Sequence, residues 1–120
     1  MPSAKRERGD EFEALAAKHL TRAGLEPIGR NALTRFGEID LIMRDDATVV
    51  FVEVRYRKGA AFGGAVGSVD ARKQAKLAVA AAQFLQRSPR LAKQPCRFDV
   101  VAISGDEPYR IDWIRDAFRL

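Results

Sequence analysis

Residues 37–58 place the strongest constraint on how this chain can fold. They read GEIDLIMRDDATVVFVEVRYRK, two runs in which apolar residues alternate with charged ones on either side of the turn-forming segment 45–47. Such alternation is typical of strands that bury one face, because successive side chains point to opposite sides. We therefore predict strands over 37–44 and 48–57 that form an antiparallel hairpin.

The hydrophobic pattern also predicts the register of this hairpin. A two-residue loop at Asp46 and Ala47 keeps the apolar faces together, whereas a slip of one residue would turn one of them outward. A longer loop of the same parity would keep the faces and shift the pairing by two. The two-residue loop predicts the pairs Ile39–Val54, Leu41–Val52 and Met43–Val50, and it also sets Asp40 opposite Glu53 and Glu38 opposite Arg55.

The predicted opposition of Asp40 and Glu53 is unfavourable unless something offsets the two charges. Opposed side chains lie about 5 Å apart, and like charges there destabilise a sheet. Two such carboxylates need a shared proton, a neighbouring cation or a bound metal ion. Arg55 and Arg57 can neutralise the pair, which makes a purely structural charge cluster one interpretation. The other is a Mg²⁺ or Mn²⁺ site, since these ions prefer oxygen ligands and can activate water at a phosphodiester.

The rest of the chain predicts an α/β domain with a mixed sheet flanked by helices. We predict a helix over 7–23, a short strand over 25–30 that ends at the turn-forming Asn31, a Gly-rich loop over 58–68, a helix from the N-cap Asp70 to about 87, and strands over 98–104 and 109–114. The order is α-β-β-β-α-β-β in one domain over 1–120, with residues 1–6 disordered. Phe62 in the Gly-rich loop is a weak candidate for stacking on a base.

Composition excludes several classes of protein and site. A single cysteine, Cys96, rules out a disulfide framework and a cysteine-rich zinc site, and a single histidine, His19, argues against a histidine-dependent nuclease. No segment resembles a signal peptide or a membrane span of roughly 18 apolar residues, so we expect a cytoplasmic protein without a membrane partner. The net charge of +5 permits nucleic-acid binding without selecting it.

Basic residues are concentrated at the start of the second predicted helix. Arg72, Lys73 and Lys76 occupy its first two turns, where cations oppose the helix dipole. The same place attracts a phosphate group, because free backbone N–H groups point toward it. Together with Arg57 they predict an electropositive track for nucleic acid; the alternative is a solvated basic face.

Several of these segments together resemble one family of small bacterial proteins, the YraN-like family. They are Glu13 in an Ala-rich helix, Arg30-Asn31, GEIDLI at 37–42, FVEV at 51–54 and RFDVV at 97–101, and the resemblance covers about 9–103. The YraN-like family in turn resembles the PD-(D/E)xK nuclease-like fold, near archaeal Holliday-junction resolvases and other restriction-endonuclease-like domains. The resemblance implies a metal-dependent phosphodiesterase and a possible homodimer that acts on branched or structured DNA.

The resemblance also implies roles for individual residues. Asp40 matches the aspartate of the motif, Glu53 its second carboxylate and Arg55 its lysine, and the carbonyl of Val54 would be a further metal ligand. Glu13 matches an additional carboxylate on a helix. It borders the apolar stripe of the first predicted helix, from which it can reach toward the sheet.

Arg55 is the one significant departure from the motif. Arginine stays protonated and cannot serve as a base, although it can hold a phosphate and offset charge in a transition state. Three hypotheses follow: a Mg²⁺- or Mn²⁺-dependent endonuclease of DNA or structured nucleic acid, a non-catalytic nucleic-acid-binding module on the same fold, and a small adaptor whose carboxylate cluster is structural.

Overall fold

The computed structural model describes residues 4–59 and 66–119, so the suggestion made for Phe62 lies outside it. Its elements, in order, are α1 (Ala4–Arg22), β1 (Glu26–Thr34), β2 (Gly37–Asp45), β3 (Thr48–Arg57), the 3₁₀ turn η1 (Val66–Ser68), α2 (Ala71–Gln86), the short α3 (Pro89–Ala92), β4 (Cys96–Ser104) and β5 (Arg110–Phe118). The predicted α/β class and the order of its main elements are confirmed, with η1 and α3 in addition. No described helix is long and apolar enough to cross a membrane.

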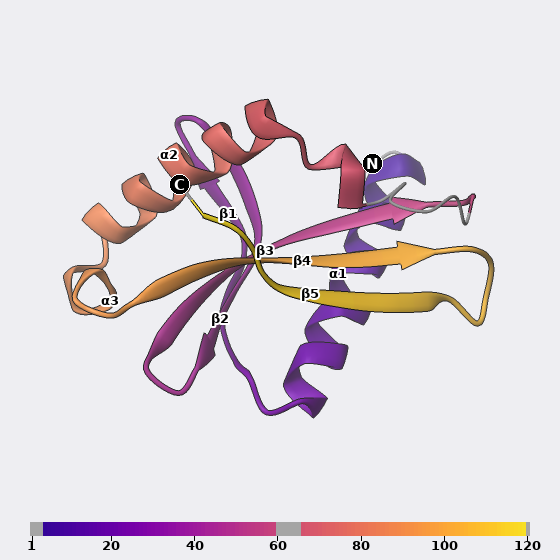
Figure 1. The fold of residues 1–120 in the computed structure, drawn as a ribbon, viewed down its shortest axis with the longest axis horizontal. Coiled ribbons are helices and arrows are strands. Elements are labelled where there is room, and N and C mark those ends of the chain that lie inside the picture. The colour runs from indigo at the N-terminus through magenta and orange to yellow at the C-terminus, as the bar shows by residue number, and fades with distance from the viewer. Residues whose placement is uncertain (1–3, 60–65, 120) are drawn as a thin grey trace.

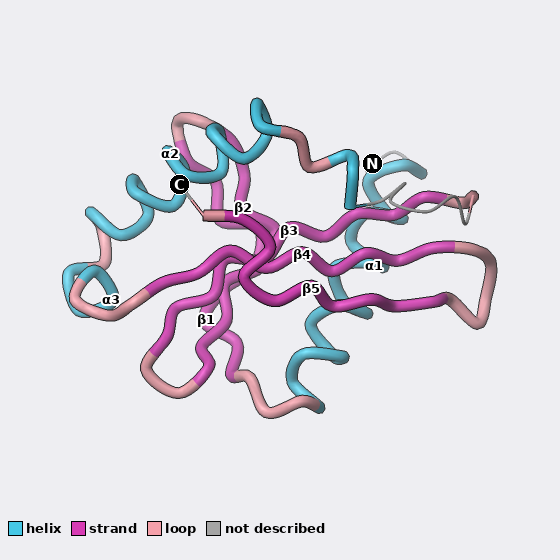
Figure 2. Tube along the Cα trace, viewed as in Figure 1, coloured by secondary structure: helices cyan, strands magenta, loops and turns pink. Residues whose placement is uncertain are grey.

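The five strands form one mixed sheet in the order β1-β2-β3-β4-β5, drawn in magenta in Figure 2. β3 and β4 are parallel, and α2 belongs to the connection between them, as a parallel pair requires a crossover. The other neighbouring strands are antiparallel. The parallel pair therefore lies at the centre of the sheet, with its strands buried from both sides.

One long helix covers each face of the sheet (Figure 1). On the α1 face, Phe12, Ala16 and Leu20 of the helix form one core with alternate residues of β2, β3 and β4. These strand residues include Leu41, Val50, Val52, Val101 and Ile103. On the α2 face the buried residues include Ile42, Val49, Phe51, Leu77, Ala80, Ala81 and Val100. Apolar burial on both faces explains why the central strands read as nearly continuous hydrophobic runs.

The predicted hairpin forms, and its register is as predicted from the turn as far as the pair of Leu41 and Val52. Leu41 pairs with Val52, Met43 pairs with Val50, and a two-residue turn follows the pair of Asp45 and Thr48. The pairing recorded between β2 and β3 ends at Leu41. Ile39 belongs to the core on the α2 face, whereas Leu41 belongs to the core on the α1 face. The prediction that these two residues share a face is wrong, because the strand alternation is interrupted at Asp40.

Three other boundaries differ from the prediction. β1 does not end at Asn31 but continues to Thr34, because Asn31 adopts a left-handed φ of 50° within the strand and pairing resumes at Ala32. β5 extends to Phe118, whose ring stacks on that of Phe98 with centroids 4.9 Å apart. α1 begins at Ala4, three residues before the predicted start of this helix at Glu7.

Candidate metal centre

A cavity of about 340 Å³ brings together carboxylates from three elements. Glu13 comes from α1, Asp40 from β2 and Glu53 from β3, and all three line it. Glu38, Arg55 and Lys73 form other parts of its wall, and the rings of Phe12 and Tyr56 supply an apolar side. The cavity thus lies at the C-terminal end of the central strand β3, where residues of the first half of α1 and the first turn of α2 also line it.

Asp40 is held between the two strands of the hairpin by a backbone donor. Its Oδ2 atom accepts a hydrogen bond from the Val54 amide at 2.9 Å. Burial raises the pKa of Asp40 above its usual range, while the Val54 amide, Glu13 and Lys73 lower it and the charge of Glu38 raises it. A fixed orientation and a raised pKa are both typical of a carboxylate at a functional site, such as a metal ligand without its cation.

Glu53 is the most deeply buried acid of the cavity, with only 4% of its surface exposed. Its Oε1 atom lies 3.2 Å from Nε of Arg55 and 3.8 Å from Nζ of Lys73. Its Oε2 atom is buried without a hydrogen-bond partner among the described residues. Burial, followed by the charge of Asp40, raises the pKa of Glu53 to about 7, against the effect of the two cations. One oxygen of this carboxylate therefore still lacks a positive partner.

Glu13 completes the carboxylate cluster from the helix side. Its Oε1 atom accepts a hydrogen bond of 2.6 Å from Nδ2 of Asn31, which also donates to Oε1 of Glu38 at 2.6 Å. Burial raises the pKa of Glu13 to about 7, the Asn31 hydrogen bond lowers it, and Asp40 raises it by its charge and by hydrogen bonding. The pKa values of two carboxylates of the cavity, Glu13 and Glu53, are thus both raised to about 7.

The donor set fits an open hard-metal site and not a closed protein cage. Within residues 8–59 and 67–119, no group of three or more histidine, cysteine or acidic side chains could hold a metal ion. Mg²⁺ is usually bound through only one or two carboxylates, with waters and substrate phosphates completing its shell. Asp40 and the unpartnered Oε2 of Glu53 match that requirement. Ligand roles for Glu13 and for the Val54 carbonyl stay predictions.

The predicted site residues divide into two groups. Asp40, Glu53, Arg55 and Glu13 all line the carboxylate cavity, and the roles that the resemblance implies for them stay predictions. Of the four cations expected in the electropositive track, Lys73 reaches the cavity wall, whereas Arg57, Arg72 and Lys76 are exposed. Glu38 was expected opposite Arg55; it instead accepts from Asn31, and Arg55 pairs with Glu53, because the β2–β3 pairing has already ended.

Sequence reasoning missed how close Lys73 and Asn31 lie to the carboxylates. The N-cap at Asp70, whose Oδ1 accepts from the Lys73 amide at 2.9 Å, fixes where α2 begins and is a signal in the sequence. That cap places Lys73 in the first turn, but only the packing of α2 on the sheet shows that the turn faces Glu53. No local signal indicates that Asn31 contacts Glu13, which lies 18 residues earlier.

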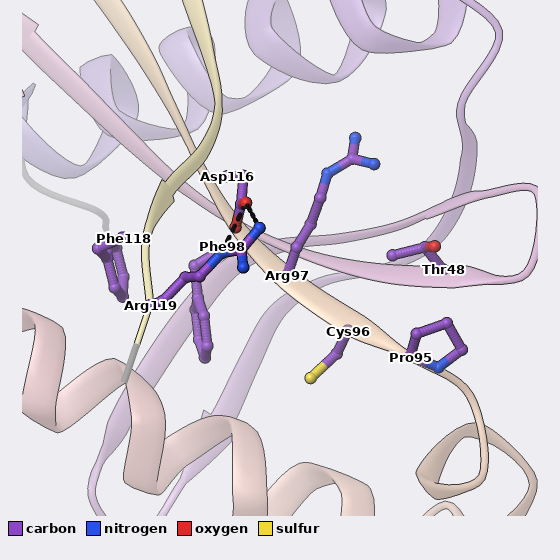
Figure 3. A pocket seen from close by; sticks show the side chains of 8 residues that line it. All are labelled: Thr48, Pro95, Cys96, Arg97, Phe98, Asp116, Phe118 and Arg119. Atoms are coloured by element: carbon purple, nitrogen blue, oxygen red, sulfur yellow. Dashed lines mark hydrogen bonds and ion pairs between the residues drawn. The ribbon is translucent and has the colours of Figure 1, made fainter.

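A second cavity, of about 570 Å³, lies near the start of β4 (Figure 3). It exposes the free thiol of Cys96 beside the rings of Phe98 and Phe118. The two arginines that line it are already paired, Arg119 with Asp116 and Arg97 with acidic neighbours. This larger cavity therefore offers no uncompensated charge among its described lining residues, unlike the carboxylate cavity.

The comparison with known proteins gives one consistent result. Residues 12–103 match the family described as uncharacterised protein family UPF0102. A UPF0102 protein of Xanthomonas campestris pv. campestris is 55% identical over 120 residues, covering 100% of this chain and 98% of the relative. One of Pseudomonas aeruginosa is 51% identical over 118 residues, covering 96% and 94%. The chain therefore belongs to the uncharacterised protein family UPF0102, as the YraN-like resemblance implied.

Proposed function

We propose that this protein is a Mg²⁺- or Mn²⁺-dependent endonuclease that hydrolyses phosphodiesters of DNA or structured nucleic acid. The observation that carries the proposal is Glu53, an acid 4% exposed whose Oε2 atom has no partner among the described residues. An uncompensated buried carboxylate oxygen is unfavourable, and its environment includes the negative charge of Asp40. A divalent cation at this point would relieve both effects.

In this proposal Asp40 and Glu53 hold the ion, Glu13 supports it from α1, and the Val54 carbonyl can complete the protein ligands. When bound, the metal would lower the pKa of a water molecule and stabilise negative charge on the phosphodiester. The Val54 amide fixes the orientation of Asp40, so this ligand does not have to reorganise on binding. The cavity is not enclosed, so waters and substrate phosphates could complete such a shell.

The two cations beside Glu53, Arg55 and Lys73, have different roles in this proposal. Arg55 lies 3.2 Å from the buried carboxylate of Glu53 and offsets its charge. The side chain of Lys73 is 33% exposed and also lines the cavity, so its ammonium can contact a substrate phosphate. The motif has a lysine at the position of Arg55. We propose that Lys73 takes the role of that lysine in this protein. The exposed Arg57, Arg72 and Lys76 would extend the electropositive track along the nucleic acid.

A non-catalytic nucleic-acid-binding module is the second candidate. It is favoured by the ion pairs that Arg55 and Lys73 already make with Glu53, which compensate one carboxylate oxygen without a metal. The third possibility, an adaptor with a structural charge cluster, requires neither metal nor nucleic acid. A homodimer would give the endonuclease two cavities for two strands, and that assembly belongs to the same proposal.

The test compares wild type with Asp40→Asn and Glu53→Gln on flapped, branched and single-stranded DNA and on structured RNA. Each substrate is incubated with Mn²⁺, with Mg²⁺ and with a chelator. Asp112→Asn is the matched control, because Asp112 is a 47% exposed partner of Arg110 on β5. We expect metal-dependent cleavage by wild type and by the control, and none by the other two variants. Salt-sensitive binding without cleavage would support the second candidate, and neither activity would support the adaptor.

A further inference from the structure

Asn31 lies within β1 at a point where the backbone is distorted, and its side chain contacts the carboxylates of Glu13 and Glu38. Its φ of 50° falls in the left-handed region, which asparagine tolerates better than most residues. Its neighbours Arg30 and Ala32 pair normally with Leu41 and Ile39 of β2. The distortion is therefore confined to the residue that would otherwise face Asp40.

The side-chain amide of Asn31 links two acids that come from different elements. Nδ2 donates to Glu13 of α1 and to Glu38 of β2, each at 2.6 Å. A primary amide nitrogen carries two hydrogens, so these two bonds use its full donor capacity. Asn31 is also the sole asparagine of the chain. Asn31 thus combines a left-handed backbone conformation with a side-chain amide that links Glu13 to Glu38.

We propose that Asn31 is a positioning residue that holds Glu13 in the candidate metal centre. Glu13 is only half-buried and lies near the negative charges of Asp40 and Glu38, so without a donor its side chain would turn toward solvent. A backbone conformation that most residues avoid persists where surrounding contacts stabilise it, and such outliers cluster at functional sites. This inference rests on the proposed function, because the role of Glu13 is that of a ligand or outer-shell partner.

The test separates the amide of Asn31 from its backbone conformation. Asn31→Gly removes the amide and keeps the positive φ, whereas Asn31→Ala removes the amide and disfavours that φ. Mn²⁺ affinity is measured by electron paramagnetic resonance titration. We expect both variants to bind Mn²⁺ about 10-fold more weakly, the lower end of the effect of outer-shell partners. Asn31→Ala should also lower Tm by several degrees more than Asn31→Gly, because only alanine disfavours the positive φ.

Two further variants complete this experiment. Asp46→Gly is the matched control, because Asp46 has a φ of 51° in the hairpin turn and does not line the cavity. It should leave Mn²⁺ affinity unchanged. Glu13→Gln should weaken binding as much as Asn31→Gly, and the double variant should show no additional loss. Wild-type affinity in Asn31→Gly, or losses that add in the double variant, would overturn the inference.

A measurement without metal distinguishes this inference from the proposed function. Labelling asparagine with ¹⁵N gives a single side-chain amide signal, and its hydrogen exchange reports the bridge directly. We expect slow exchange in wild type and faster exchange in Glu13→Ala, which has no side-chain oxygen to accept from Asn31. If wild type binds no Mn²⁺ but this pattern holds, the proposed function fails and the positioning of Glu13 stands. Fast exchange in wild type would contradict the bridge whatever the metal does.

Discussion

Oδ2 of Asp40 accepts the backbone N–H of Val54 at 2.9 Å, in the place where a neighbouring strand would supply a carbonyl. The recorded pairing of β2 with β3 ends one residue away, at Leu41 and Val52. The side chain of Asp40 therefore continues the hydrogen bonding of the sheet, and the same residue lines the cavity. The Val54 amide thus keeps a hydrogen-bond acceptor, although that acceptor is the Asp40 carboxylate and not a strand carbonyl.

The first prediction separates these two roles of Asp40. Asp40→Asn keeps an oxygen that can accept from Val54 but removes the negative charge, so it should fold with near wild-type stability and lose metal binding. Asp40→Ala leaves the Val54 amide without its acceptor and should lower the free energy of unfolding by about 1–3 kcal/mol. Urea unfolding of both variants checks this. Equal stability of the two would show that the Val54 contact is dispensable.

The second prediction concerns Glu53 and pH. Its pKa is raised from 4.5 to about 7, chiefly by burial, so the folded protein binds more protons than the unfolded chain between those values. Wild-type stability should therefore fall as pH rises through this range, because the carboxylate must ionise in place. Glu53→Gln does not titrate. It should match wild type near pH 4.5 and be more stable above pH 7 by about 1–3 kcal/mol in the absence of metal.

Thermal unfolding of Glu53→Gln across pH, with Glu26→Gln as a control, tests this directly. Glu26 is exposed on β1 and paired with Arg44, so its substitution should change stability by no more than about 0.5 kcal/mol at each pH. Adding Mn²⁺ should reverse the order at pH 8, because only wild type keeps both ligands. A constant difference between Glu53→Gln and wild type at all pH values would contradict the assignment.

The regular pairing of β2 with β3 could be predicted from the local sequence pattern. The irregular positions, Asp40 and Asn31, could not. Alternation and the two-residue turn predicted the pairs Leu41–Val52 and Met43–Val50, which the structure confirms. They could not show that Asp40 bonds an amide of the next strand, because a period of two assumes an unbroken ladder. Asn31 was interpreted as a turn for a sound local reason, its tolerance of positive φ, but that conformation occurs inside β1.

The third prediction concerns the two lysines at the start of α2. Lys73 lies 3.8 Å from Glu53 and lines the cavity, whereas Lys76 is exposed on the same helix. Lys73→Gln should lower the single-turnover rate of phosphodiester cleavage about 100-fold, the typical effect of removing one donor to a transition state. Lys76→Gln should mainly weaken binding and reduce its salt dependence by about one counterion. Equal effects of the two on the rate would place Lys73 outside the site.

The fourth prediction concerns Asp99, which holds β4 and β5 together away from the carboxylate cavity. Asp99 is fully buried and accepts from Arg97, from Nε1 of Trp113 and from the amide of Asp116. Asp99→Ala would leave the donors of Trp113 and Asp116 unpaired, while Arg97 keeps Asp45. It should destabilise the protein by about 3–5 kcal/mol, because each unpaired buried donor costs about 1–3 kcal/mol. Asp112→Ala, which breaks an exposed pair, should lower stability by less than about 1 kcal/mol. Chemical unfolding of both variants checks the contrast.

Calorimetric titration of the metal-free protein with Mn²⁺ at pH 7, in two buffers of different ionisation enthalpy, tests the candidate metal centre most directly. The pKa values of Glu13 and Glu53 are raised to about 7, so both carboxyls are partly protonated at this pH, and a bound cation must displace protons. We predict saturable binding with proton release in wild type, lost in Asp40→Asn and Glu53→Gln. Absent binding, or binding that persists unchanged in both variants, would contradict a metal centre at Asp40 and Glu53.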